Sequence, residues 1–208
     1  MYKRQVNDLT VSNPDGSEGT LPKAWVADFL DVPSGQQFYG LVTTLVRNAI
    51  TVGVGGGLYG VNDPTLRQQM AVFLLKAAHG LCYQPPPCAG IFTDVPCSSS
   101  FAPWIEALAA EGITGGCGTG IYCPQNPVRR DQMAVFLLKT KHGSSYVPPP
   151  CDGDFDDVPC PGQPFADWIE QLAAELITSG CGGNNYCPNN PNTRGQMAVF
   201  IVTTFHLQ

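Results

Sequence analysis

The chain has 208 residues, of which 13% are charged, and its formal net charge is −6 at pH 7. It therefore lacks the basic field that attracts phosphate backbones, and we expect no nucleic-acid partner. No apolar run reaches the roughly 18 residues that a spanning helix needs, so we expect no membrane span. Nine cysteines in a proline-rich, lysine-poor chain are typical of an oxidising, extracellular compartment. Because residues 1–31 lack the pattern of a secretory signal, we expect the chain to be part of a longer exported protein.

Residues 1–25 alternate weakly, with apolar side chains at Val6, Leu9 and Val11. They are followed by Asn13-Pro14-Asp15-Gly16, which is a strong turn signal. We expect this lead to be a strand or an extended segment, or the remnant of an upstream domain.

The rest of the chain consists of three sequence repeats. Arg67, Arg130 and Arg194 open three similar segments, and the offset between neighbouring copies is 63 and then 64 residues. The predicted repeats span residues 26–84, 85–147 and 148–208. A unit of this size alone buries little apolar surface, so the three should share one core.

Each repeat predicts a helix, a loop and a second helix. The first helix is clearest at Trp104 to Gly112, where Ile105 and Leu108 point one apolar face inward. The second contains six successive apolar residues, Met133 to Leu138, and a helix that is apolar all round belongs in the centre of a domain. The sequence thus predicts a mainly all-α fold of three helix-loop-helix units around three central helices.

The end of the first helix differs among the repeats. Gly112 supplies a left-handed stop in the second repeat, because glycine has no Cβ to clash there. Ala49 and Leu176 stand at this position in the other repeats, so we expect those helices to end differently.

Eight cysteines occupy positions shared by the second and third repeats, and the first repeat has other residues at all four positions. Loss of all four together suits bonded partners, each pair closing a small loop worth about 2–3 kcal/mol. The alternative is zinc, although the gaps differ from the usual ligand spacing. Cys82 has no equivalent and is either a free thiol or a link to another chain. The expected pairs are Cys88–Cys97, Cys117–Cys123, Cys151–Cys160 and Cys181–Cys187.

Each inner helix begins with an arginine, where the helix dipole disfavours a cation by about 0.3–1 kcal/mol. Such a misplaced charge indicates a role, either in an ion pair with the aspartate of the Asp-Val-Pro turn or in binding an external anion. The aspartates of these turns are Asp31, Asp94 and Asp157.

The chain offers few other candidates for metal-binding or catalytic residues. His79, His142 and His206 share one position at the ends of the inner helices, where an imidazole suits the dipole, although a threefold metal site is the alternative. No Ser–His–Asp, Cys–His or metal-plus-base set emerges. We therefore expect no enzyme activity, no cofactor and no metal.

The second repeat resembles the S-layer homology module, and the other two repeats match less fully in the same order, so that the resemblance covers about residues 28–208. The ordered motifs are Phe92-Thr93-Asp94-Val95-Pro96, Trp104-Ile105, Gly112-Ile113-Thr114-Gly115-Gly116, Gly118-Thr119-Gly120-Ile121-Tyr122 and Arg130-Asp131-Gln132-Met133-Ala134.

The resemblance implies a pseudo-threefold body with a central three-helix bundle. It also implies a non-catalytic module at the bacterial cell surface or cell wall, which holds its protein there by binding acidic cell-wall polysaccharide or another peptidoglycan-linked polymer. In that family the ligand lies in grooves between repeats, where the motif arginine meets a sugar carboxylate. The alternative function is a structural subunit that assembles into a surface layer or filament, with self-assembly through Cys82 as one route.

Carried over to this chain, the resemblance assigns the glycan site. In all three copies glutamine replaces the family's glutamate, which leaves the arginine freer to meet an external anion, and only the third repeat keeps a Thr-x-x-Gln capping box. The tryptophans match the family's aromatic position, with packing of the first helix as the alternative. The implied residues are Arg67, Arg130, Arg194, Gln69, Gln132, Gln196, Trp104, Trp168, Asp31, Asp94 and Asp157.

Overall fold

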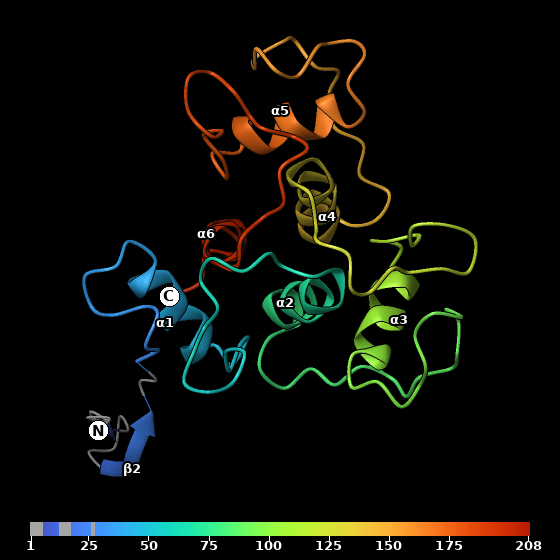
Figure 1. Cartoon of the computed structure of the whole chain (residues 1–208). Coiled ribbons are helices and arrows are strands. Elements are labelled where there is room, and N and C mark those ends of the chain that lie inside the picture. The colour runs from blue at the N-terminus through green and yellow to red at the C-terminus, as the bar shows by residue number, and fades with distance from the viewer. Residues whose placement is uncertain (1–5, 13–17, 26–27) are drawn as a thin grey trace.

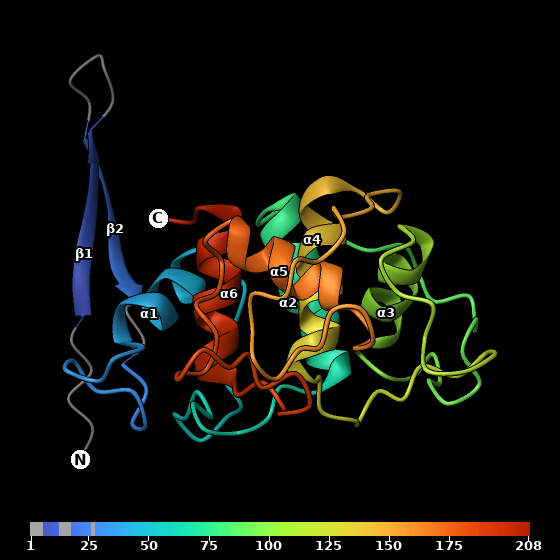
Figure 2. The same cartoon turned by 90° about the horizontal axis from the view of Figure 1, so that it is seen from above.

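The computed structural model describes residues 6–12, 18–25 and 28–208. The N-terminal part forms two antiparallel strands, β1 (Val6–Ser12) and β2 (Glu18–Trp25), beside the α1 end of the molecule (Figure 2). The described residues of this lead thus form strands, as one of the expected alternatives has it, and its origin in an upstream domain stays a prediction. The turn predicted at Asn13 to Gly16 lies outside the described residues.

The remainder is helical, which confirms the predicted mainly α-helical class (Figure 1). Each predicted repeat contains a shorter and then a longer helix, and the exact repeat boundaries stay predictions. None of the described helices is long and apolar enough to cross a membrane. The helices are α1 (Tyr39–Arg47), α2 (Arg67–His79), α3 (Ala102–Ala110), α4 (Arg130–His142), α5 (Ala166–Ala174) and α6 (Arg194–Phe205).

The longer helices α2, α4 and α6 contact one another in pairs at the centre of the molecule (Figure 1). Each shorter helix packs on the longer helix of the preceding repeat: α3 on α2, α5 on α4, and α1 on α6. The apolar side chains Met70, Met133 and Met197 are fully buried here, as a helix that is apolar all round requires. A symmetry axis relating the repeats stays a prediction, although these contacts are the ones it would need.

A small cycle of backbone hydrogen bonds joins the segments that precede the inner helices. Thr65 N–H donates to Asn192 O at 2.8 Å, Asn192 N–H donates to Val128 O at 2.9 Å, and Val128 N–H donates to Thr65 O at 2.9 Å. All three residues are fully buried. The first and third repeats therefore meet directly, and the chain closes on itself.

The longer, inner helices α2, α4 and α6 find hydrogen-bond acceptors for their first N–H groups in a neighbouring repeat. The first N–H groups of a helix have no partner within it. Here Arg67 N–H donates to Asn126 O, Arg130 N–H to Asn190 O, and Arg194 N–H to Asp63 O, at 2.9 to 3.0 Å. The loop of one repeat thus satisfies the start of the inner helix of the repeat before it.

The four expected disulfides are present, so the zinc alternative is wrong. They staple the loops of the second and third repeats only. Cys82 is a free, exposed thiol.

The three shorter, outer helices α1, α3 and α5 end in the same way, so the expectation that two of them end differently is wrong. Ala49 and Leu176 adopt left-handed φ values of 51° and 58°, close to the 71° of Gly112. The next residue in each repeat is a buried isoleucine, for example Ile113 at 4% exposed. Burial of that side chain outweighs a left-handed cost of about 1–2 kcal/mol.

Replacing Ala49 with glycine should therefore stabilise the protein by about 1 kcal/mol, because the strain of a left-handed alanine is removed. The reverse change Gly112→Ala should destabilise it by more, since the new Cβ would stand 2.8 Å from Ser144 Cβ. Urea unfolding of the two variants beside the parent measures both effects. A lower midpoint for A49G would contradict the explanation.

Candidate functional site: the grooves between repeats

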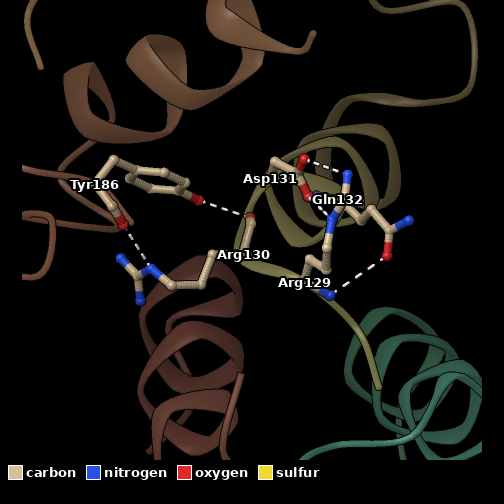
Figure 3. Close-up of polar contacts among 5 residues, drawn as sticks. All are labelled: Arg129, Arg130, Asp131, Gln132 and Tyr186. Carbon is tan, nitrogen blue, oxygen red and sulfur yellow. Dashed lines mark hydrogen bonds and ion pairs between the residues drawn. The ribbon is translucent and has the colours of Figure 1, made fainter. Parts of the chain in front are cut away.

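Each motif arginine forms a reciprocal contact with a tyrosine of the next repeat. Arg130 Nε donates to Tyr186 O at 2.7 Å, and Tyr186 OH donates back to Arg130 O at 2.8 Å (Figure 3). The same pair of bonds joins Arg67 to Tyr122, at 2.9 Å each, and Arg194 to Tyr59, at 2.7 and 2.9 Å. The three pairs run from the first repeat to the second, from the second to the third, and from the third to the first.

The guanidinium groups lie between aromatic rings. Arg130 Cζ stands 4.7 Å from the centre of the Tyr186 ring and 5.7 Å from that of Phe200. Arg67 lies against Tyr122 and Phe136, and Arg194 against Tyr59 and Phe73, at 4.6 to 5.6 Å. A cation over a desolvated ring is worth about 2 kcal/mol, which offsets part of the cost of burying the charge.

These arginines are only 2–4% exposed, and one terminal nitrogen of each, Nη2, is buried with no hydrogen-bond partner. Burial lowers the pKa of all three guanidinium groups, but arginine remains protonated in proteins. Burial also raises the pKa of the tyrosines, so their hydroxyl groups stay donors. Each interface therefore holds a permanent, partly unsatisfied positive charge.

The aspartates of the Asp-Val-Pro turns hold the tyrosine loops. Asp94 accepts hydrogen bonds from Tyr122 N–H at 2.9 Å and Cys123 N–H at 2.7 Å, and Asp157 does the same for Tyr186 and Cys187. Asp31 accepts three such bonds, which lower its pKa although burial alone would raise it. Among the described residues, no ion pair joins these aspartates to the motif arginines. The aspartates position the partners of the arginines instead.

The motif glutamines serve the helix starts. Oε1 of Gln69, Gln132 and Gln196 accepts a hydrogen bond from the N–H three residues earlier, at 3.1 to 3.3 Å. Only Thr193 returns the bond, since its hydroxyl accepts from Gln196 N–H at 3.2 Å. The prediction that the third repeat alone forms a complete capping box is confirmed.

A groove of about 430 Å³ opens between the second and third repeats. This volume is within the range of small-ligand sites. The residues that line it include Arg130, three with a side-chain hydroxyl and one with a side-chain amide, beside apolar residues, and none of them has a carboxylate. The lining residues are Arg130, Leu176, Ile177, Thr178, Ser179, Gly180, Gln196, Val199, Phe200 and Thr203.

The tryptophans lie elsewhere. Trp104 and Trp168 are half-buried, and neither lines this groove. Trp104 packs beside the edge of Tyr83, with Lys76 Nζ 5.7 Å from its ring centre, and Trp168 repeats this arrangement with Tyr146. Their surroundings favour the packing alternative for both residues.

Metal chemistry finds little support in the part of the chain that the structure describes. The one cluster with suitable ligand types is Cys88, Cys97 and Glu106, and its two sulfurs are already bonded to each other. His79 and His142 do not converge, because they pair with Glu111 and Glu175 at 2.8 Å. The threefold histidine site is therefore not formed among these residues.

The sequence reasoning missed the three tyrosines. Their signal was present, because Tyr59, Tyr122 and Tyr186 are the same residue type at the same repeat position. It also missed that Asp131, which the other repeats lack, is fully buried and paired with Arg129 at 2.6 Å (Figure 3).

The matches to a known protein family fall within the first two of these repeats. Two stretches, residues 28–71 and 91–134, match the S-layer homology domain. They run from the Asp-Val-Pro turn, through the outer helix and loop, into the arginine-bearing inner helix. The third repeat has the same elements in the structure, and its membership of the S-layer homology family stays a prediction.

Two curated relatives are similar to this chain. A "Cell surface protein" of Thermoanaerobacter kivui is 28% identical over 53% of the chain and 15% of its own length. The "S-layer protein EA1" of Bacillus anthracis is 24% identical over 85% of the chain and 20% of its own length. The chain thus spans a fifth or less of either relative.

Arg130 and Tyr186 should contribute unequally to stability. Tyr186→Phe removes one buried hydrogen bond, the one from the tyrosine hydroxyl to Arg130 O, at a cost of about 0.5–1.5 kcal/mol. Arg130→Ala also removes the Nε bond and both ring contacts, so we expect a larger loss. Thermal unfolding measures both, with Arg47→Ala as the control at an exposed arginine of α1. An Arg130→Ala variant as stable as the parent would contradict the structural role of Arg130.

Proposed function

We propose that this chain is a non-catalytic module that anchors a bacterial protein to its cell envelope by binding acidic cell-wall polysaccharide in grooves between repeats. The matches to the S-layer homology domain and the two surface-protein relatives indicate the extracellular cell surface as its location. The proposal that the ligand is a glycan depends on the properties of the groove.

The observation that carries the proposal is the composition of the groove at Arg130. Arg130, three residues with hydroxyl groups and Gln196 line the groove and can supply donors, while Leu176, Val199 and Phe200 supply apolar surface. A pyranose ring with a carboxylate is amphipathic in the same way, because its C–H faces are apolar and its substituents accept hydrogen bonds. Since no carboxylate lines the groove, nothing there repels an anion.

The buried arginine suits this task because it does not move. Tyr186 fixes Nε, and two rings fix the plane of the guanidinium. A pre-positioned cation loses little conformational entropy when an anion binds, and a dry environment strengthens the attraction.

A structural subunit of a self-assembling layer is the alternative function. It is favoured by the exposed free thiol of Cys82 and by the relation to an S-layer protein over 85% of the chain. Ordered self-association of the purified chain without any glycan, lost in a Cys82→Ser variant, would favour this alternative.

A cosedimentation assay tests the anchoring proposal. The chain should pellet with bacterial cell-wall fragments that retain their attached polysaccharide, and it should stay in the supernatant when that polysaccharide has been removed by acid. Ser179→Trp, an exposed change in the wall of the groove, should weaken retention by about tenfold or more through steric exclusion.

Val147→Trp is the control for this assay, because Val147 is 79% exposed and does not line the groove. It should bind like the parent. Equal retention of the S179W and V147W variants would contradict binding in this groove, and equal pelleting with stripped walls would contradict the glycan ligand.

A further inference from the structure

The three grooves differ at one position on the inner helix. Thr203 lines the open groove of the third repeat, and its equivalents are Lys139 in the second repeat and Lys76 in the first. The opposite wall is otherwise built alike in the first and third repeats. Gly53 N–H donates to Thr51 Oγ1 at 3.1 Å, as Gly180 N–H does to Thr178 Oγ1.

In the first repeat, the lysine spans this groove. Lys76 Nζ donates to Ala49 O at 2.8 Å. Ala49 is the equivalent of Leu176, which lines the open groove of the third repeat together with Thr203. In the first repeat, the inner helix is therefore tied to the end of the outer helix, and both of these elements line the groove in the third repeat. A hydrogen bond from a charged donor is among the stronger ones, so a ligand would have to displace it to enter.

We propose that the residue at this position decides which grooves accept a ligand. On this account Thr203 keeps the Arg130 groove open, whereas the Lys76 ammonium straps the Arg194 groove shut. The inference rests on the proposed glycan-binding function and adds which groove is used and for what charge. With the strap absent, Arg130 is the one charged group lining the open groove, so the preferred ligand is a sugar that carries a single carboxylate.

The second repeat has a lysine at this position but lacks the hydrogen bond that Lys76 makes, among the residues that the structure describes. Lys139 Nζ lies 6.0 Å from the centre of the Trp168 ring, and Gly112 stands where Ala49 and Leu176 stand in the other repeats. The test therefore compares the first and third repeats, which differ most clearly.

The experiment is an NMR titration of the full chain with methyl glucuronide, a sugar with one carboxylate, and with methyl glucoside as the neutral control. Amide signals of Ile177 to Gly180 report on the open groove, and those of Ile50 to Gly53 report on the strapped groove. In the parent, the glucuronide should shift the first set and leave the second unchanged, and the glucoside should shift neither.

Exchanging threonine and lysine at this position should exchange the ligand binding of the two grooves. Thr203→Lys should raise the Kd of the open groove by about tenfold or more, while Thr203→Ser leaves it unchanged. Lys76→Thr should make Ile50 to Gly53 respond. Because lysine already occupies this position in two repeats, T203K is compatible with the helix.

The possible outcomes distinguish failure of the lysine strap from failure of glycan binding. Tighter glucuronide binding by T203K, or equal shifts of both amide sets in the parent, would overturn the strap and leave glycan binding standing. Failure of every groove to respond, in the parent and in K76T alike, would overturn glycan binding itself.

Discussion

The structure depends on one reciprocal contact, made three times: an arginine at the start of an inner helix and a tyrosine in the loop of the next repeat. Each residue binds the other's backbone carbonyl, so neither can shift without breaking both bonds. Because the third arginine returns to the first repeat, the contact closes a cycle. The backbone bonds among Thr65, Val128 and Asn192 close a second one. Units too small to be stable alone thereby become one body.

The same contact explains why a cation sits where the helix dipole opposes it. The arginine is held by a carbonyl and two aromatic rings, and the helix start is completed by carbonyls of the neighbouring loop. A positive charge fixed at a junction between repeats would also attract an anion, since burial reduces its screening by water. The structural role of this residue is therefore compatible with the ligand-binding role proposed for it at the Arg130 groove.

Much of this was predictable from the sequence, because the repeats supply internal comparisons. The paired loss of cysteines gave the disulfides, and the apolar runs gave the inner helices. Long-range partners were not predictable. An Arg–Asp ion pair was one of the two roles considered for the arginines, but Asp94 and Asp157 accept hydrogen bonds from backbone N–H groups of the loop instead. The left-handed Ala49 and Leu176 were missed because burial of the next isoleucine overrides local preference. Groove openness depends on a single side chain, Thr203 or lysine, whose reach only the folded chain reveals.

A structure of the chain bound to an acidic cell-wall oligosaccharide tests the central claim most directly. The account predicts the sugar carboxylate against Arg130, with the ring over Val199 and the substituents facing Thr178, Ser179 and Thr203. A carboxylate bound instead at the tryptophan faces or at the lysines of the inner helices, with the Arg130 groove empty, would contradict it.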